Sequence, residues 1–206
     1  MRTIAAFDFD GTLSSRDNVV PYLRTACGTG AVARAGVAAA PALLAARKDP
    51  NQRDVAKAIV VERLLAGRTE ASLRDLGERF ARLVVARHLN PAVAERLVAH
   101  RDAGHEVVIV SASLTLYLDA AAALLGVGTV LATTVAVGPD GRCTGAIAGA
   151  NVRGPEKVRR LDEWLGPEPA YVHAYGDSSG DDELLARADH GVRVDRKGGI
   201  PPLTLR

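Results

Sequence analysis

The sequence predicts an α/β protein whose core is a doubly wound parallel sheet, with a small all-helical cap inserted after the first strand and a short β-hairpin flap. Short apolar runs alternate along the chain with stretches of helical pattern, which is typical of strand–helix–strand units. Most of these runs are apolar at consecutive positions, as expected for a sheet covered on both faces. The strands are predicted at residues 3–8, 106–111, 129–133, 171–177 and 191–195.

The composition is that of an ordinary globular protein, with 48% hydrophobic and 24% charged residues among 206. A formal net charge of +2 gives no indication of nucleic-acid binding, so we expect no nucleic-acid partner. The two cysteines, Cys27 and Cys143, are far apart and lack metal-ligand spacing. They therefore argue against a disulfide framework and against a zinc site built on them.

The first predicted strand ends on two acids. In the stretch DFDGT, one residue separates Asp8 from Asp10, so in an extended chain their side chains point to the same side and repel each other. A divalent cation such as Mg²⁺, which prefers oxygen ligands, would offset that repulsion. The alternative is that Asp10 and Gly11 only form the turn that ends the strand.

The segment that follows shows no strand pattern and reads as a series of helices. We expect residues 15–101 to form the cap, and residues 1–14 and 102–206 to form the α/β core. Such a cap would lie over the carboxyl ends of the strands, where open α/β sheets bind their ligands. Helix breaks are predicted at residues 28–30, 41, 49–50, 67 and 90–91.

One stretch of this segment, residues 28–46, is nearly free of charge, but it contains Arg34 and is marginal in length for a membrane span. It is predicted to be a buried or partner-facing helix rather than an integral membrane span, and contact with a membrane surface stays open as an alternative. The first strand begins at Thr3, which leaves no room for a signal segment before it. We therefore expect a cytoplasmic protein.

In the second half of the chain, strand ends and helix starts carry candidate site residues. Ser111 ends the second strand, Lys157 lies in the first turn of a helix, and Asp177 ends the fourth strand, four residues before Asp181. The carboxyl ends of parallel strands meet at one edge of a sheet, where Asp8 also lies. The remaining elements are predicted as helices at 114–126, 154–166 and 180–188, a hairpin at 133–149 around GPDG, and a surface-draped tail at 196–206.

Together these residues resemble the four motifs of the haloacid dehalogenase-like (HAD) phosphatase superfamily, which are an aspartate pair, a serine or threonine, a lysine and a second acidic pair. All four are present in that order, and the resemblance spans nearly the whole chain. The helical insertion and the string YGDSSGD are similar to those of the phosphoserine-phosphatase-like branch, subfamily IB. The resemblance implies a Rossmann-like core and a phosphomonoester hydrolase.

The resemblance also implies a role for each residue. Asp8 attacks phosphorus and becomes an aspartyl-phosphate, and Asp10 protonates the leaving oxygen and later activates water. Ser111 and nearby backbone N–H groups, with Ala112 among the phosphate-binding residues, hold the phosphoryl oxygens. Lys157 neutralises charge on Asp8 and on the phosphoryl group.

The implied cofactor is Mg²⁺. Its expected ligands are Asp8, the backbone carbonyl of Asp10, and Asp177. Asp181 is expected to support the metal through a bound water or through a hydrogen bond to one of the ligands.

The substrate is predicted to be a small phosphorylated metabolite, but the cap departs from the phosphoserine phosphatases. Those enzymes carry a glutamate nine residues after the nucleophile, where this chain has Asp17, a residue that also suits a helix N-cap. An ungapped alignment places Val61 where they carry an arginine. The alternatives are a phospholipid-headgroup phosphatase or a phosphotransferase with the same site, and a non-catalytic protein that binds a phosphorylated ligand. The oligomeric state is not predicted.

Overall fold

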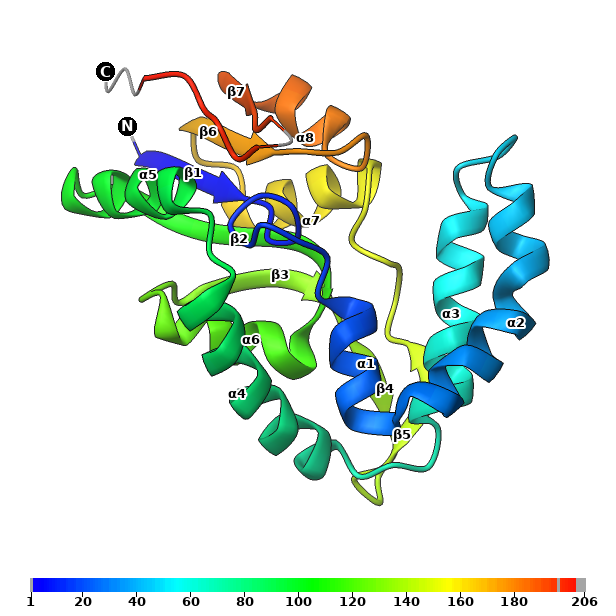
Figure 1. Cartoon of the computed structure of the whole chain (residues 1–206). Coiled ribbons are helices and arrows are strands. Elements are labelled where there is room, and N and C mark those ends of the chain that lie inside the picture. Colours follow the sequence, from blue (N-terminus) through cyan, green and yellow to red (C-terminus); the bar gives the residue numbers. More distant parts are fainter. Residues whose placement is uncertain (1, 196, 203–206) are drawn as a thin grey trace.

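The computed structural model describes residues 2–195 and 197–202. Its centre is a five-stranded parallel sheet with strand order β3-β2-β1-β6-β7, so the first strand lies in the middle (Figure 1). This sheet confirms the predicted α/β class. The strands are β1 (Arg2–Phe7), β2 (Glu106–Leu114), β3 (Thr129–Thr133), β6 (Ala170–Gly176) and β7 (His190–Arg193).

Both faces of the sheet are covered, which is why the strands are apolar at consecutive positions. On one face, Phe7, Ile109 and Tyr175 belong to a buried cluster that includes side chains of helices α5 and α6. On the other face, Ile4 and Val172 pack with side chains of α7 and α8. These helices are α5 (Pro91–Asp102), α6 (Thr115–Leu124), α7 (Pro155–Leu165) and α8 (Asp182–Arg187).

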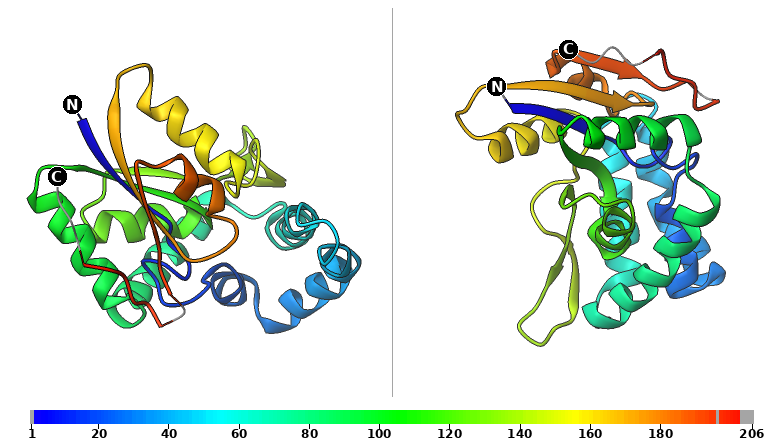
Figure 2. Two further views of the ribbon diagram at one scale, coloured as in Figure 1. Left: turned by 90° about the horizontal axis from the view of Figure 1, so that it is seen from above. Right: turned by 90° about the vertical axis from the view of Figure 1, so that its left-hand side faces the viewer.

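Five helices follow one another between β1 and β2. The antiparallel helices α2 and α3 lie side by side away from the sheet (Figure 2) and pack through small side chains such as Ala39, Ala42 and Ala56. Helix α4 instead packs on α6, and α5 lies against the sheet. The division into a core and a cap at residues 15 and 101 stays a prediction. The first four of these helices are α1 (Val19–Cys27), α2 (Thr29–Ala45), α3 (Gln52–Leu65) and α4 (Glu70–Arg87).

The helix break predicted at residue 41 is wrong, because α2 continues through Pro41 to Ala45. Proline in a helix removes one hydrogen bond to the carbonyl four residues earlier. Here that carbonyl belongs to Val37, whose side chain is 76% exposed, so water can satisfy it. Pro41 also lies near the end of the helix, where few turns remain to be disturbed.

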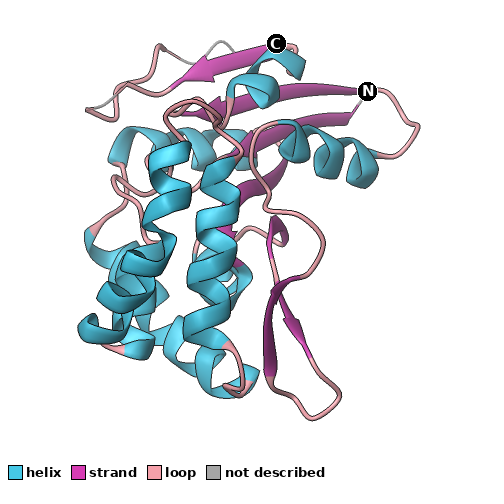
Figure 3. Ribbon diagram, turned by 90° about the vertical axis from the view of Figure 1, so that its right-hand side faces the viewer, coloured by secondary structure: helices cyan, strands magenta, loops and turns pink. Residues whose placement is uncertain are grey.

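The predicted hairpin is present as the antiparallel pair β4 (Val135–Val137) and β5 (Cys143–Ile147), which projects away from the main sheet (Figure 3). It is tied to the loop between α3 and α4, because the Gly67 N–H donates to the Cys143 carbonyl and the Cys143 N–H donates to the Arg68 carbonyl, both at 2.8 Å. The turn end of the flap is thus attached to the helical segment.

Across the described residues, no helix combines the length and the apolar character that crossing a bilayer requires. In the same part of the chain Cys27 and Cys143 are free thiols. The predicted tail lies partly outside the described residues. Within them, the Pro201 carbonyl accepts a hydrogen bond from Arg96 on α5.

Candidate active site

The carboxyl edge of the sheet opens into a cavity of about 1020 Å³, and every site residue predicted from the sequence lines it. Asp8 and Asp10 follow β1, and Asp177 follows the neighbouring strand β6. The loop after β1 approaches Asp177 so closely that a Cβ on Gly11 would lie 2.4 Å from a carboxylate oxygen of Asp177. The other predicted residues at the cavity are Asp17, Ser111, Ala112, Lys157 and Asp181.

Lys157 is the central cation of this edge. Its side chain is only 3% exposed, and Nζ lies 2.6 Å from Asp8 Oδ1 and 2.5 Å from Asp181 Oδ1. Helix α7 begins at Pro155, so Lys157 lies in its first turn and points back into the site. Burial lowers the pKa of Lys157, but the two carboxylates outweigh that effect and raise the pKa above its usual range.

Three carboxylates gather around this lysine. Asp8, Asp177 and Asp181 each offer an oxygen within 4.8 Å of the others. Thr12 Oγ1 lies between two of them, 3.4 Å from Asp8 Oδ2 and 3.3 Å from Asp177 Oδ1. One buried ammonium therefore faces three carboxylates, and hard oxygen donors with excess negative charge suit a cation such as Mg²⁺.

The pKa values of these acids reflect the same excess of negative over positive charge. Burial raises the pKa of Asp8 to about 7, against the opposing charge of Lys157. Burial also raises the pKa of Asp177. It acts in the same direction on Asp181, but the charge and the hydrogen bond of Lys157 outweigh it and hold the pKa of Asp181 below its usual range.

Asp10 is held by hydrogen bonds to both of its carboxylate oxygens. Asn18 Nδ2 donates to Oδ1 at 2.7 Å, and Ser113 Oγ donates to Oδ2 at 2.8 Å. Burial raises the pKa of Asp10 to about 6, although these hydrogen bonds oppose the rise. The carboxyl group can therefore both release and take up a proton near neutral pH.

The end of β2 places Ser111 at the same edge. Ser111 is buried, and its Oγ accepts a hydrogen bond from the Ser113 N–H at 3.2 Å. The Ala112 carbonyl accepts a hydrogen bond from Lys57, a residue of α3. The end of β2 is thus in direct contact with the helical segment inserted after β1.

Lys57 is the functional candidate that the sequence did not reveal as a site residue. Besides the Ala112 carbonyl, its Nζ reaches Asn151 Oδ1 at 2.5 Å. Burial lowers the pKa of Lys57 to about 8, although the negative charge of Asp10 opposes the shift. Asn18 and Ser113 were also missed, but Ser113 follows Ser111 by two residues in a strand, a spacing that places both side chains on one side.

Asp17 lies at the exposed rim of the cavity. Its Oδ1 accepts a hydrogen bond from the Val19 N–H at 3.0 Å, at the start of α1. The N-cap of α1 is Asn18, so the N-cap alternative for Asp17 is wrong by one residue. The contact of Asp17 with substrate stays a prediction.

The wall opposite the carboxylates is apolar and comes mainly from α2 and α3. Val32, Ala39 and Leu43 line the cavity from α2, and Val60 lines it from α3. Four arginines also contribute to the lining, and they are Arg24, Arg47, Arg53 and Arg153. The cavity therefore combines an acidic floor with an apolar and partly cationic wall.

Comparison with known proteins agrees with this geometry. Residues 5–186 match the family model described as haloacid dehalogenase-like hydrolase. The chain is 37% identical over 197 residues to protein CicA of Caulobacter vibrioides, covering 94% of this chain and 86% of CicA. It is 29% identical to phosphoserine phosphatase of Halobacterium salinarum, covering 96% and 88% of the two chains. A crystal structure from Bordetella pertussis Tohama I is similar with a TM-score of 0.74 and 27% identity, covering 90% and 86%.

Proposed function

Because this chain belongs to the haloacid dehalogenase-like hydrolase family, we propose that it is a phosphatase that hydrolyses a phosphomonoester through a phosphoryl group carried on Asp8. The observation that carries the proposal is the convergence of Asp8, Asp177 and Asp181 around Lys157 at the floor of the cavity. The phosphate group of a monoester is anionic. The floor of the cavity offers a nucleophile to attack it, and a buried cation and metal-binding oxygens to balance its charge.

Asp8 is the proposed nucleophile. Lys157 binds its Oδ1. Oδ2 is contacted, among the described residues, only by Thr12 at 3.4 Å, so it is the oxygen available for attack on phosphorus. In this step the Asp8 oxygen forms a bond to phosphorus and the ester oxygen leaves with the bonding electrons. The ammonium group of Lys157 stays close to both carboxylate and phosphoryl oxygens and reduces their mutual repulsion.

Asp10 is the proposed proton donor and acceptor. As an acid it transfers its proton to the leaving oxygen, and as a base it takes a proton from the water that then attacks the phosphoryl group on Asp8. The hydrogen bonds from Asn18 and Ser113 fix the carboxyl group beside Asp8 during both steps. Ser111 and the backbone around Ala112 are proposed to bind the phosphoryl oxygens.

We propose that Mg²⁺ is bound by Asp8, Asp177 and the Asp10 carbonyl, and that Asp181 supports the ion indirectly, because its own oxygens accept hydrogen bonds from Lys157 and Ser178. When bound, it neutralises charge between the nucleophile and the phosphoryl group. The donor set fits this ion, because its side-chain ligands are hard carboxylates and because burial raises the pKa of Asp8, a cost that a nearby cation offsets.

The substrate is proposed to be a small phosphorylated metabolite. Lys57, which reaches the end of β2 from α3, is well placed to contact a polar group of the substrate beyond its phosphate. The Halobacterium relative is named for phosphoserine, but this chain has Asp17 and Val61 where the sequence comparison expected the amino-acid-binding residues, and Val61 is fully buried. Phosphoserine is therefore not the proposed substrate. The protein is proposed to act in the cytoplasm.

A second candidate is a phospholipid-headgroup phosphatase, and the observation that favours it is the apolar wall formed by α2. Leu43 lines the cavity and is 52% exposed, and its neighbour Leu44 is 62% exposed. Apolar side chains that lead from solvent toward the acidic floor would suit an amphiphilic phosphomonoester or contact with a membrane surface.

The proposal is tested by phosphate release from a panel of small and lipid phosphomonoesters with Mg²⁺, with and without EDTA. Turnover that needs Mg²⁺ and disappears in Asp8→Asn supports the proposed chemistry, and the best ester identifies the substrate class. Transfer to added alcohols instead of water would identify a phosphotransferase. Binding of a phosphate mimic without turnover on any ester would favour a non-catalytic binding protein.

The two substrate classes are distinguished by comparing phosphomonoesters that share a headgroup but differ in the length of the hydrocarbon chain. A headgroup phosphatase turns over long-chain esters better than short-chain ones, and Leu43→Asn removes this preference without reducing turnover of the short ester. Equal turnover of both esters in the wild type would exclude the lipid alternative.

A further inference from the structure

Four of the five histidines of the chain gather on one face of the sheet, away from the carboxylates. His100 lies in the last turn of α5, His105 directly precedes β2, and His173 lies in the middle of β6. His173 comes four residues before Asp177 in the same segment, which places it roughly 13 Å from the catalytic edge at the rise of an extended strand. None of the three lines the catalytic cavity in the described structure.

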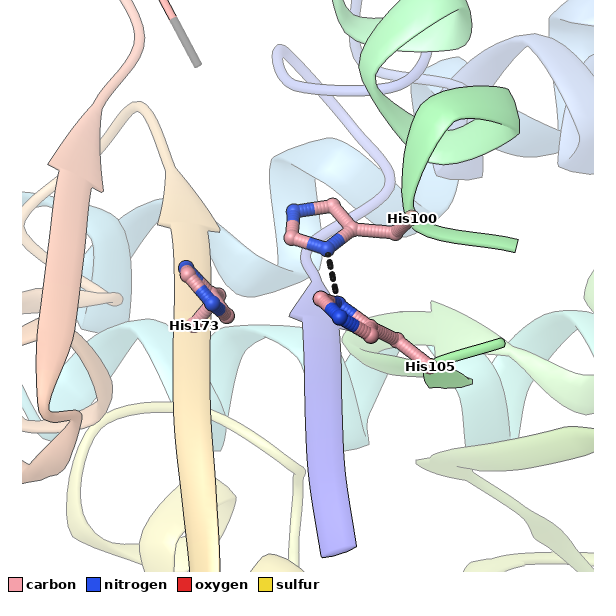
Figure 4. A group of neighbouring side chains, drawn as sticks. All are labelled: His100, His105 and His173. Atoms are coloured by element: carbon pink, nitrogen blue, oxygen red, sulfur yellow. Dashed lines mark hydrogen bonds between the residues drawn. The ribbon is translucent and has the colours of Figure 1, made fainter. Parts of the chain in front are cut away.

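The side chains of these three histidines lie next to one another, with His100 and His105 in contact and His173 beside them (Figure 4). Each offers a nitrogen within 4.8 Å of the other two, and His100 Nδ1 lies 2.8 Å from His105 Nδ1. The residue of β1 that pairs with both His173 and Val107 is Ala5, which contributes only a methyl group at this place in the sheet. The backbone brings the other two together, since the His105 N–H donates to the His100 carbonyl at 3.0 Å.

His173 supplies an independent observation. Its side chain is buried at 2% exposure, yet its Nδ1 has no hydrogen-bond partner among the described residues. Buried polar atoms are nearly always paired, so an unpaired ring nitrogen beside two other imidazoles calls for a ligand. A proton can satisfy the contact between His100 and His105, but no described group satisfies this nitrogen of His173.

We propose that His100, His105 and His173 form a second metal site that binds an imidazole-preferring divalent ion of the Zn²⁺ class. Neutral imidazole is a good ligand for Zn²⁺, Ni²⁺ and Co²⁺, whereas Mg²⁺ prefers oxygen. Three histidines with an open fourth position are a known donor set for zinc. His190, whose ring centroid lies 5.4 Å from that of His173, is the nearest further imidazole.

Side chains around the three histidines can orient the imidazole of His100 for metal binding. His100 Nε2 lies 2.7 Å from Tyr175 Oη, so the tyrosine oxygen can accept the proton of that nitrogen and leave Nδ1 free to bind metal. Arg96 donates a hydrogen bond to the same tyrosine oxygen at 3.2 Å. The Arg96 guanidinium also lies over the Tyr175 ring, 5.5 Å from its centroid. His105 is partly exposed, which provides a path for an ion from solvent.

Metal binding requires the three rings to adjust, because their nitrogens lie within 4.8 Å of one another but not at the spacing of a metal site. Tetrahedral zinc with Zn–N bonds of about 2.0–2.1 Å places its ligand nitrogens about 3.3 Å apart. His100 and His105 must therefore separate slightly from their 2.8 Å contact, and His105 can move because it lies outside any helix or strand. The bound ion would tie α5 and the start of β2 to β6, so its role is to stabilise the sheet.

The test uses equilibrium dialysis of the untagged protein against Zn²⁺ in an Asp8→Asn/Asp177→Asn background, which removes the carboxylate site. One bound Zn²⁺ per chain is expected there, with a rise in Tm on metal addition. His105→Ala should weaken binding at least about 100-fold, and Tyr175→Phe, which removes only the supporting hydroxyl, by about 10–100-fold. The matched control is His88→Ala, because His88 is the one histidine outside the cluster.

Absence of Zn²⁺ binding in that background, or equal binding by His105→Ala, would overturn the proposal. If the double variant does not fold, the comparison is made with Co²⁺ in the wild type at saturating Mg²⁺. Visible absorption bands of tetrahedral Co²⁺ that are present in the wild type and His88→Ala but absent in His105→Ala support the site. Identical spectra of all three proteins would refute it.

Discussion

At the scale of single residues, Asp10 and Lys57 are two cavity groups, besides Asp8, whose pKa values lie near physiological pH and whose expected functions differ. Burial raises the pKa of Asp10 to about 6 and lowers that of Lys57 to about 8. Asp10 can therefore exchange a proton during turnover, whereas Lys57 carries its charge at neutral pH and loses it in mild alkali. These two residues give separate tests of the proton transfer and of substrate binding.

Replacing Asp10 by asparagine should reduce kcat by about 10²–10⁴-fold, because the leaving oxygen and the attacking water lose their proton partner. The initial phosphorylation step should suffer less with p-nitrophenyl phosphate than with an alkyl phosphate, since a nitrophenolate leaves without protonation. Burst and steady-state rates on both esters measure this difference. An equal loss in the burst rate on the two esters would argue against a role as proton donor.

Lys57 should make substrate affinity depend on pH above neutrality. As the pH rises through about 8 the ammonium loses its proton, so KM for an anionic substrate should rise by about tenfold in the wild type. Lys57→Arg stays charged over this range and should give a flat KM profile. KM profiles from pH 6.5 to 9.5 for both proteins check this, and identical profiles would contradict a substrate contact through Lys57.

The catalytic residues could be foreseen because each is tied to an element boundary. Asp8 and Asp177 follow strands, and Lys157 begins a helix, so the parallel sheet brings them to one edge. Lys57 and Asn18 could not be foreseen in the same way, because they reach the site through the packing of inserted helices, and no spacing in the sequence fixes that packing. The roles assigned to all these residues stay predictions.

At the scale of elements, helix α4 approaches α6 closely at one glycine. A Cβ on Gly77 would lie 1.8 Å from the Leu116 carbonyl oxygen, so the two backbones meet there without a side chain between them. Gly36 in α2 provides the contrast, since nothing among the described atoms lies within 4 Å of a Cβ built on it. The same substitution should therefore have opposite effects in the two helices.

Gly77→Ala should lower the free energy of unfolding by about 1–3 kcal/mol, because the added methyl group forces α4 and α6 apart. Gly36→Ala should raise it by about 0.5–1 kcal/mol, because alanine is the better helix former. Urea denaturation of the two variants and the wild type measures both changes. A stabilising Gly77→Ala would show that α4 and α6 do not pack as closely as described.

The elements were mostly predictable, and the errors have local causes. The strand predicted to end at Ser111 continues to Leu114 in β2, because Leu114 still pairs with Thr133 of β3 after a shift in register. Helix α2 continues through Pro41 because the carbonyl that loses its partner is exposed. The hairpin was predictable from its GPDG turn, since such turns join alternating strands.

At the scale of the whole molecule, the apolar character of the strands predicted a sheet covered on both faces, and the order of the motifs predicted membership of the HAD-like family. Both predictions are confirmed. The placement of α2 and α3 relative to the sheet was not predictable, because their contacts with each other are made by small side chains without a distinctive pattern. This placement shapes the wall of the cavity and thereby the substrate preference.

The buried histidines should make the stability of the metal-free protein depend on pH. Burial lowers the pKa of His100 to about 3 and that of His173 to about 4, whereas an unfolded histidine titrates near pH 6.5. Between about pH 7 and pH 4 the unfolded chain binds more protons, so the free energy of unfolding falls as the pH is lowered through this window. Each histidine contributes up to about 1.4 kcal/mol per pH unit.

Tm measured in EDTA at pH 7, 6 and 5 checks this dependence against His100→Asn, which should show a shallower decline than the wild type. The Tm of the wild type should not change with pH above about 7.5 through these histidines, and it should keep falling until the pH nears the lowered pKa values of His100 and His173. Parallel Tm profiles of the two proteins would show that His100 is not a source of the acid sensitivity.

A phosphoryl group carried on Asp8 is detected by acid quenching followed by peptide mass spectrometry. Asp10→Asn should slow the attack of water, so during turnover of an activated ester the peptide that contains Asp8 should gain the mass of one phosphoryl group, and Asp8→Asn should not. Turnover with no phosphoryl group on that peptide, or retained turnover in Asp8→Asn, would show that Asp8 is not the nucleophile.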